Sequence, residues 1–182
     1  MSYSAHRRSS RAKRKRDKLI LIGIGGNLAS MRFGAARDTL AAALAALEAE
    51  GIQIMARSSW YRTEPVPPSD QPWVVNAVAL LATNLAAPDL LAVLQAVEGK
   101  FGRVRGERNA ARVLDLDLLD HQGQVTETPS LVLPHPRLHQ RRFVLVPLAE
   151  IVPSWRHPVS GLTAKQLLSR LAARQLIERL PC

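Results

Sequence analysis

The stretch around which this chain is organised is Arg103-Val-Arg-Gly-Glu-Arg-Asn-Ala-Ala-Arg-Val-Leu-Asp-Leu-Asp-Leu-Leu119. Its second half has the composition of a strand. Because the side chains of a strand alternate between two faces, Asp115 and Asp117 should point the same way. The leucines between and around them should point the opposite way, into a core. The stretch therefore predicts a strand with one apolar face and two neighbouring carboxylates on the other.

Two carboxylates held side by side repel each other unless a positive charge neutralises them. Magnesium prefers oxygen ligands and is commonly held by one or two carboxylates together with substrate phosphates. Four arginines precede the aspartates within ten residues, and their planar guanidinium groups suit phosphate. One hypothesis is a magnesium-dependent site for phosphoryl transfer. The alternative is a strand at the edge of a sheet whose solvated aspartates guard against aggregation, and this stretch alone leaves both open.

Composition indicates an ordinary globular protein. The chain has 182 residues, of which 47% are hydrophobic and 22% charged, which suits one domain with a substantial core. The single cysteine, Cys182, excludes a disulfide within the chain and a cysteine-rich zinc site, and it suits a cytoplasmic protein. No apolar run is long enough to cross a bilayer, so we expect no membrane partner.

The basic charge is concentrated at the N-terminus. Residues 1–18 carry eight lysines and arginines and one aspartate, a net charge of +7 out of the chain's +10. This segment is polar and lacks apolar periodicity, so we expect a disordered basic tail over 1–18 and a single domain over 19–182. The tail could be a transit peptide, an RNA-contacting arm, an extension at the start site or a solvated segment without function. The domain lacks aromatic residues interleaved with basic ones, so we expect no specific nucleic acid.

Apolar periodicity predicts the elements of the domain and their order. Strands are expected over 19–24, 52–61, 74–83 and the aspartate pair, and helices over 32–50, 88–98, 144–151 and 163–171, with a hairpin or loop over 121–130. The leucines at positions 40, 44 and 47 have helical spacing in the first helix. The second helix has Leu91, Leu94 and Val97 on one apolar stripe and Gln95 and Glu98 on its other face. The order of these elements predicts an α+β fold, a ferredoxin-like antiparallel sheet with helices packed on one face, followed by C-terminal helices. A proline-rich loop over 62–72 and an arginine-rich loop over 102–113 are long enough to act as lids over a site.

Three other kinds of site are excluded or disfavoured. A dinucleotide-binding fingerprint beginning at Gly23 would need glycine at position 28, where Leu28 stands. The phosphate-binding loop motif G-x-x-x-x-G-K-[ST] does not occur. His135 and His139 have the spacing of a helical metal pair, but Pro136 breaks the helix that such a pair requires and no third ligand is near, so zinc is not expected.

Several motifs, in a shared order and spacing, carry a resemblance to a known family. They are Ile24-Gly-Gly-Asn-Leu28, Ser59-Trp-Tyr-Arg-Thr63, Asp70-Gln-Pro72, Asn76-Ala77, Gly102-Arg-Val-Arg105, Arg112-Val-Leu-Asp-Leu-Asp-Leu118, Leu133-Pro-His-Pro-Arg137, Arg141 and Phe143-Val-Leu-Val-Pro-Leu148. Together they make residues 19–171 resemble the 6-hydroxymethyl-7,8-dihydropterin pyrophosphokinases of folate biosynthesis. No single motif among them would be specific.

The resemblance implies a single-step reaction between two small molecules, ATP and 6-hydroxymethyl-7,8-dihydropterin. The pterin hydroxymethyl oxygen attacks the β-phosphorus of ATP, a pyrophosphoryl group moves, and AMP leaves. Catalysis would rest on in-line positioning and charge neutralisation. Asp115 and Asp117 would hold two magnesium ions that bridge the phosphates. The enzyme is expected to be a cytoplasmic monomer.

The resemblance also implies the remaining site residues. The catalytic group would be Arg103, Arg112, Asp115 and Asp117. The contacts to ATP would be Gln95, Glu98, Arg105, Arg108, Arg112, His135 and Arg141. The pterin pocket would be formed by Thr63, Val66, Val74, Asn76 and Phe143. A lone asparagine in an apolar strand is more often satisfied by the backbone, but a pterin edge offers groups with which the amide of Asn76 could pair.

The chain departs from the family pattern in four places. Asn109-Ala110-Ala111 stands where Trp-Gly-Pro is common, Val74 where an aromatic is common, Glu64 where proline is usual, and Gly26 where serine is usual. These departures motivate an alternative, a catalytically weakened ferredoxin-like module that binds pterin or nucleotide. A nucleic-acid-binding protein that uses the basic tail is a third hypothesis.

Overall fold

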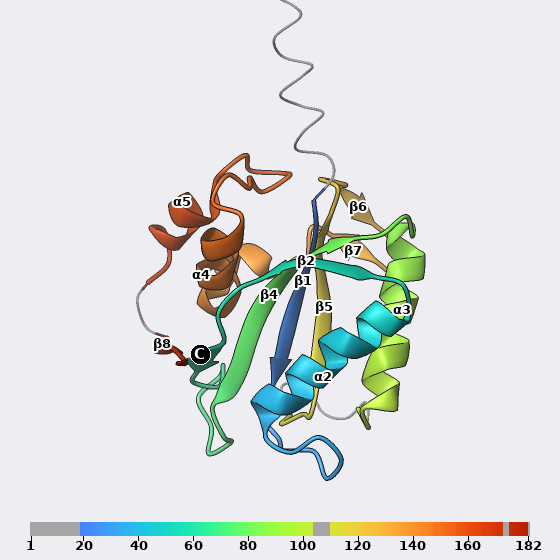
Figure 1. Cartoon of the computed structure of the whole chain (residues 1–182). Coiled ribbons are helices and arrows are strands. Elements are labelled where there is room, and N and C mark those ends of the chain that lie inside the picture. The colour runs from blue at the N-terminus through green and yellow to red at the C-terminus, as the bar shows by residue number, and fades with distance from the viewer. Residues whose placement is uncertain (1–18, 104–109, 173–174, 182) are drawn as a thin grey trace, which may run out of the picture.

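The computed structural model describes residues 19–103, 110–172 and 175–181 (Figure 1). In chain order its elements are β1 (Ile20–Gly26), α2 (Ala36–Ala49), β2 (Gln53–Arg57), β3 (Tyr61–Thr63), β4 (Val74–Ala82), α3 (Ala87–Lys100), β5 (Asp115–His121), β6 (Thr126–Glu127), β7 (Val132–Leu133), the 3-10 helix η1 (Leu138–Gln140), α4 (Arg142–Ile151), α5 (Ala164–Leu168) and β8 (Ile177–Arg179). The basic tail and the predicted site residues Arg105 and Arg108 lie outside the described residues.

The centre of the molecule is an antiparallel sheet of six strands, in the order β5-β1-β4-β3-β8, in which β2 also pairs with β4. The central strands β1 and β4 pair over their whole lengths, from Ile20 opposite Leu81 to Gly26 opposite Val75. The strand that carries the aspartates, β5, pairs with the other edge of β1. The prediction of an α+β fold with a ferredoxin-like antiparallel sheet is therefore confirmed.

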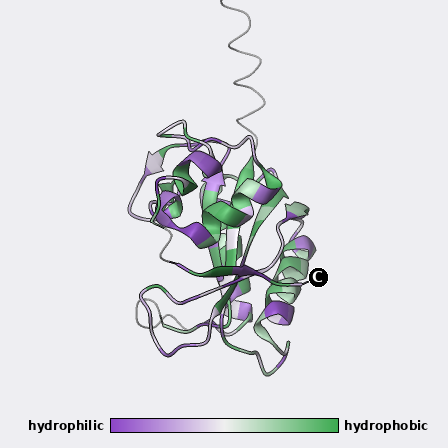
Figure 2. Ribbon diagram, turned by 90° about the vertical axis from the view of Figure 1, so that its left-hand side faces the viewer, coloured by the Kyte–Doolittle hydropathy of each residue, from purple (hydrophilic) through white to green (hydrophobic). Residues whose placement is uncertain are grey.

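Helices cover both faces of this sheet, with α2 and α3 on one side and α4 and α5 on the other (Figure 1). Alternation along β1 explains this arrangement, because successive side chains belong to two different cores. Ile20, Ile22 and Ile24 pack in the core with α2 and α3, whereas Leu21 packs in the core with α4 and α5. The helices that were predicted to pack on one face of the sheet are α2 and α3. The C-terminal helices α4 and α5 form a second layer on the opposite face. Figure 2 shows the strands of the sheet as largely hydrophobic.

The predicted helices over 32–50 and 88–98 are present as α2 and α3, and the buried stripe of α3 differs from the prediction by one residue. In α2, the predicted leucines at positions 40, 44 and 47 are all buried. In α3, the predicted stripe was Leu91, Leu94 and Val97; the structure buries Leu94 and Val97 but places Leu90, not Leu91, fully in the core. Leu90, Leu94 and Val97 follow the four-then-three spacing of one helix face. The shift frees Leu91 to line the cavity described below.

The second predicted strand, 52–61, is divided into β2 and β3. The backbone amide of Ser58 donates to the carbonyl oxygen of Val78 at 3.0 Å, but the Ser58 hydroxyl accepts from the Val78 amide at 3.1 Å. The amide of Ser59 donates to the Glu150 carboxylate instead of to a strand. Side-chain acceptors therefore replace the strand-to-strand bonds here, and the regular ladder is interrupted.

The short strands β6, β7 and β8 had no signal in the sequence, because each is two or three residues long and pairs with a distant or equally short segment. The predicted helix over 163–171 is shorter than expected. It spans Ala164–Leu168 and begins at a capping box formed by Thr163 and Gln166. No helix within the described ranges is long and apolar enough to cross a bilayer.

Candidate active site

A cavity of about 830 Å³ lies against β5. It is bounded by the C-terminal end of β1, the proline-rich loop, α3 and the segment 130–143. Every predicted site residue that the structure describes contributes to its lining: Thr63, Val66, Val74, Asn76, Gln95, Glu98, Arg103, Arg112, Asp115, Asp117, His135, Arg141 and Phe143. The tertiary structure thus brings together residues that are up to 80 positions apart in the chain. Their individual roles stay predictions.

The aspartate strand has the predicted two faces. Asp115 and Asp117 are half-buried and line the cavity. Leu116 and Leu118 also border the cavity, but each is only 4% exposed and packs in the core with α2 and α3. As the alternative hypothesis supposed, β5 does lie at the edge of the main sheet. Its aspartates are held by basic side chains, however, and are not merely solvated. The partial burial of these aspartates and their pairing with basic side chains favour a binding site over solvated residues that only prevent aggregation.

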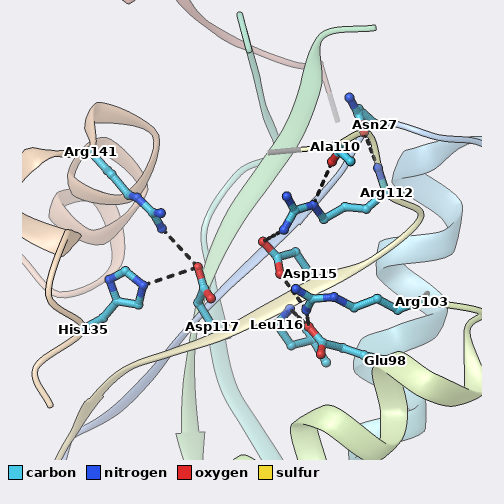
Figure 3. Close-up of polar contacts among 10 residues, drawn as sticks. All are labelled: Asn27, Glu98, Arg103, Ala110, Arg112, Asp115, Leu116, Asp117, His135 and Arg141. Carbon is cyan, nitrogen blue, oxygen red and sulfur yellow. Dashed lines mark hydrogen bonds and ion pairs between the residues drawn. The ribbon is translucent and has the colours of Figure 1, made fainter. Parts of the chain in front are cut away.

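Asp115 is held by the two described arginines of the arginine-rich loop (Figure 3). Its Oδ2 lies 3.0 Å from Nη1 of Arg112, and its Oδ1 lies 2.7 Å from Nη1 of Arg103. Burial raises the pKa of Asp115, and the neighbouring Asp117 carboxylate raises it further, while the two guanidinium groups act against this. Among the described residues, Oδ1 of Asp115 is buried and has no hydrogen-bond donor of good geometry.

Asp117 has a separate pair of basic neighbours from the opposite side of the cavity (Figure 3). Its Oδ2 accepts a 3.1 Å hydrogen bond from Nη1 of Arg141 and lies 3.9 Å from Nε2 of His135. Burial lowers the pKa of His135 and favours the neutral imidazole. The Arg141 guanidinium also lies 5.3 Å from the centre of the Phe143 ring. Each aspartate therefore has its own cationic partners, Arg103 and Arg112 for Asp115 and Arg141 for Asp117.

Glu98 has a structural role that the sequence did not reveal. The sequence placed it on the polar face of α3, but its side chain is buried and its Oε1 accepts a 2.6 Å hydrogen bond from the amide of Leu116. It also pairs with Arg103. Burial raises the pKa of this carboxyl. The sequence feature that could have indicated this burial is the position of Glu98 one helical turn after the buried Leu94.

Asn27 connects the two long loops, and the sequence marked it only as part of a motif. Its Nδ2 donates to the carbonyl oxygen of Pro72 at 3.0 Å and to Oε1 of Gln71 at 3.3 Å, both in the proline-rich loop. Its Oδ1 accepts from the amide of Arg112 at 2.9 Å. One buried side chain thereby fixes the bases of both loops relative to β1.

Gly26 stands where the family usually has serine, and the structure explains the difference. The backbone passes so close to the segment before β5 here that a Cβ atom at this position would overlap the carbonyl oxygen of Val113. A serine would require β1 and this segment to separate locally. Glycine therefore permits the close approach of β1 to the segment that leads into the aspartates.

The expected pterin end of the cavity is built around a buried polar pair. Nδ2 of Asn76 donates to Oγ1 of Thr63 at 2.9 Å and to the carbonyl oxygen of Val74 at 3.1 Å. Both side chains of the pair are buried and line the cavity. The nitrogen of this amide therefore has its partners within the protein, one of them a backbone carbonyl, as is common for an asparagine in an apolar strand. Because the pair also lines the cavity, it presents an oriented polar surface with which a ligand could pair.

Several lining residues were not among the predicted site residues. They are Asn27, Gln71, Ser130, Arg137, Gln140 and Gln175. Of these, Asn27, Gln71 and Arg137 lie within motifs that carried the resemblance. Within the described ranges, no group of three or more His, Cys, Asp and Glu side chains is close enough to hold a metal. A cation between the two aspartates would take its other ligands from phosphate and water. That is the usual coordination of magnesium in phosphoryl-transfer sites, so the carboxylates present fit it.

Comparison with known proteins agrees with this site. Residues 21–153 match the family model described as 7,8-dihydro-6-hydroxymethylpterin-pyrophosphokinase. A 2-amino-4-hydroxy-6-hydroxymethyldihydropteridine pyrophosphokinase of Pseudomonas aeruginosa is 42% identical over 163 residues, 89% of this chain and 96% of that protein. Proteins of the same name from Synechocystis sp. and Methylorubrum extorquens are 42% and 40% identical, over 83% and 82% of this chain and 75% and 91% of their own lengths. The chain therefore belongs to the 7,8-dihydro-6-hydroxymethylpterin-pyrophosphokinase family.

Proposed function

We propose that the cavity along β5 transfers the pyrophosphoryl group of ATP to the hydroxymethyl group of 6-hydroxymethyl-7,8-dihydropterin. The chain is a pyrophosphokinase of folate biosynthesis by its family, and the assignment of the reaction to this cavity is ours. The observation that carries it is the arrangement around β5, where two aspartates with separate cationic neighbours share one cavity with the buried pair Thr63 and Asn76.

The reaction exchanges one phosphorus–oxygen bond for another. The pterin hydroxymethyl oxygen forms a bond to the β-phosphorus of ATP, and the bond from that phosphorus to the α–β bridging oxygen breaks. The bridging oxygen leaves with its electron pair as part of AMP, and the hydroxymethyl proton is released. No covalent intermediate with the protein is needed, so the work of the site is to align the two oxygens and to neutralise phosphate charge.

The three arginines around the aspartates are suited to the triphosphate. Without nucleotide, Arg103 and Arg112 pair with Asp115 and Arg141 pairs with Asp117. Phosphate oxygens are acceptors of the same kind as these carboxylates and bind guanidinium groups in the same planar geometry. When ATP enters, these arginines would exchange the carboxylates for phosphates. The aspartates would then be free to accept a cation.

Asp115 and Asp117 would hold magnesium, and the carboxylate Oδ1 of Asp115, which has no donor of good geometry, is the first candidate ligand. Magnesium bound there would neutralise the phosphate charge that develops during the transfer. Two ions are expected from the family resemblance. The arginines that leave the aspartates would remain beside the phosphates and add to the same neutralisation.

The pterin would lie on the side of the cavity formed by Thr63, Asn76 and Phe143. Thr63 and Asn76 present a preformed polar surface there, and Phe143 offers an aromatic ring for the bicyclic ring system. Val66, 59% exposed on the proline-rich loop, is placed to cover a bound ring if the loop closes. Val74 provides less apolar surface than an aromatic residue would, which should weaken pterin binding and leave the reaction type unchanged.

The test is a reaction of the purified full-length protein with ATP, magnesium and 6-hydroxymethyl-7,8-dihydropterin. Equal amounts of AMP and pterin diphosphate are expected, with no AMP when the pterin is omitted. ADP as the product would indicate transfer of a single phosphoryl group and would refute the proposal. Tight binding of the pterin without turnover would instead support the weakened binding module. The monomeric state and the cytoplasmic location stay predictions.

A further inference from the structure

The C-terminal segment over residues 175–180, here called the C-terminal strap, extends from the outer edge of the sheet to the cavity. Its strand β8 pairs antiparallel with β3, with Arg179 opposite Tyr61 and Ile177 opposite Thr63. The pairing places the start of the strap beside the end of β3, where the proline-rich loop begins. Gln175 there is itself a lining residue of the cavity.

The far end of the strap is fixed to the body of the protein. Nε of Arg179 donates to Oγ of Ser59 at 2.8 Å, and Nη2 of Arg179 lies 3.7 Å from the Glu150 carboxylate of α4. The same carboxylate accepts a 2.8 Å hydrogen bond from the hydroxyl of Tyr61. Beyond the strand, the amide of residue 180 donates to the carbonyl oxygen of Trp60 at 2.9 Å. This end of the strap is therefore held in register with β3 and α4.

The near end of the strap contacts the start of the proline-rich loop, and Arg62 extends this contact to the other end of the loop. Nε2 of Gln175 donates to the carbonyl oxygen of Glu64 at 3.2 Å, across 111 positions of sequence. Glu64 is the residue directly after Thr63 of the pterin end. Glu178 pairs with Arg62 at 2.6 Å, and the Arg62 guanidinium lies 5.0 Å from the centre of the Trp73 ring at the other end of the loop.

We propose that the C-terminal strap positions the pterin end of the cavity, and that Gln175 is a positioning residue which acts through the Glu64 carbonyl on the proline-rich loop. The inference rests on the proposed function. A loop of this length loses conformational entropy when it becomes ordered over a ligand. A hydrogen bond at the base of the loop restricts it before the ligand binds, so less entropy is lost on binding. The aspartates lie on β5, and their arginines lie on the arginine-rich loop and at the start of α4. Gln175 bonds to the proline-rich loop instead, so the effect should fall on the pterin and not on ATP.

The competing explanation is that β8 merely covers the exposed edge of β3. In that case the backbone pairing of β8 matters, and the Gln175 side chain, which lies before the strand, does not. Substitution of Gln175 would then leave substrate affinities unchanged. The two explanations therefore differ in what happens when only the side chain at position 175 is altered.

The experiment compares the full-length protein with Gln175→Ala and Gln175→Glu. Gln124→Glu, an exposed glutamine in the turn after β5, is the matched control because it makes the same chemical change away from the cavity. We expect KM for the pterin to rise by about threefold to tenfold in both Gln175 variants, as for the loss of one ordinary hydrogen bond. KM for ATP and the melting temperature should match those of the control. Glutamate should have the larger effect, because its carboxylate would face a carbonyl oxygen.

Hydrogen–deuterium exchange of peptides that cover residues 62–73 provides a second readout that does not depend on turnover. Faster exchange of these peptides in both Gln175 variants, and not in the control, is expected. The strap proposal would be overturned by unchanged exchange, by an unchanged pterin KM, or by an equal rise in KM for ATP. If the parent protein makes no AMP at all, the proposed function fails, and the exchange comparison still decides the role of the strap.

Discussion

The backbone amide of Leu116 donates a 2.6 Å hydrogen bond to the buried Oε1 of Glu98. Leu116 lies between the two aspartates of β5, so this bond ties α3 to the backbone of β5 directly between the two carboxylates. The same glutamate pairs with Arg103, which in turn contacts Asp115 (Figure 3). Glu98 thus supports the site from beneath through the backbone and from the side through an arginine.

Replacement of Glu98 should separate these two effects. Glu98→Ala leaves the Leu116 amide buried without an acceptor, and we expect the free energy of unfolding to fall by about 2 kcal/mol, with a loss of turnover. Glu98→Gln retains an acceptor oxygen for the amide and should cost less stability. Urea denaturation of both variants measures the difference. Equal losses in the two variants would show that the charge, and not the hydrogen bond to Leu116, matters.

Asp115→Asn and Asp117→Asn should each lower turnover by about 100-fold or more, because removal of a charge-stabilising group from a reacting centre has effects of this size. The fold should be retained, since both side chains line the cavity and not the core. AMP release and circular dichroism measure the two properties. Asp89→Asn, at an exposed position in the first turn of α3, is the control and should remain active. Near-normal turnover in either cavity variant would remove that aspartate from the mechanism.

Asn27 offers a test of whether the two loops act together. Asn27→Ala removes the contacts to Pro72 and Arg112, and KM for both substrates should rise by about fivefold, as for the loss of ordinary hydrogen bonds. Asn27→Asp keeps the acceptor for the Arg112 amide but loses the donor to the proline-rich loop. This variant should weaken pterin binding more than ATP binding. Steady-state kinetics with each substrate varied would reveal the asymmetry, and identical profiles for the two variants would contradict it.

Arg112 should act mainly on the chemical step. Its guanidinium faces Asp115 and the cavity, while the pterin end is formed by other elements. We expect Arg112→Ala to lower kcat by about 100-fold and to change the pterin KM by less than about twofold. Arg112→Lys keeps the charge but not the planar pair of donors, so it should recover only part of the rate. A kcat that stays constant while pterin binding weakens would contradict this role.

His157 should make the stability of the protein sensitive to mild acid. Burial lowers the pKa of this imidazole, and repulsion from His139 adds to the effect. Because the folded-state pKa is lower than the unfolded value, the unfolded chain binds the proton more strongly. The folded protein therefore has its full stability above the ordinary histidine pKa of 6.5, and it loses stability as pH falls through the folded-state pKa of His157.

The corresponding measurement is the free energy of unfolding in urea between about pH 7 and about pH 5, where histidines with lowered pKa values titrate. His157→Asn should show a smaller loss of stability on acidification than the unmodified protein. Asparagine is the chosen replacement because its side-chain oxygen can accept from the amides of Val159 and Ser160, as Nδ1 of the histidine does. Parallel pH profiles for the two proteins would show that His157 does not contribute.

The sequence determined those features that depend on the local geometry of the backbone. Alternation along a strand was sufficient to place the side chains of Asp115 and Asp117 on one face and that of Leu116 on the other, in the core. Helical spacing identified the buried leucines of α2, and the order of strands and helices identified the sheet. Such features follow from periods of two and 3.6 residues, which are visible within a short window.

Only the tertiary structure decided which distant groups meet. The pairing of Asp117 with Arg141, the bond of Asn27 to Arg112 across 85 positions and the contact of Gln175 with Glu64 across 111 positions have no local pattern. The same holds for Glu98, whose position on α3 indicated a solvated side chain until β5 packed against it. A side chain's partner is set by the packing of whole elements, and so the sequence identified the chemical groups of this site while the fold determined how they are paired.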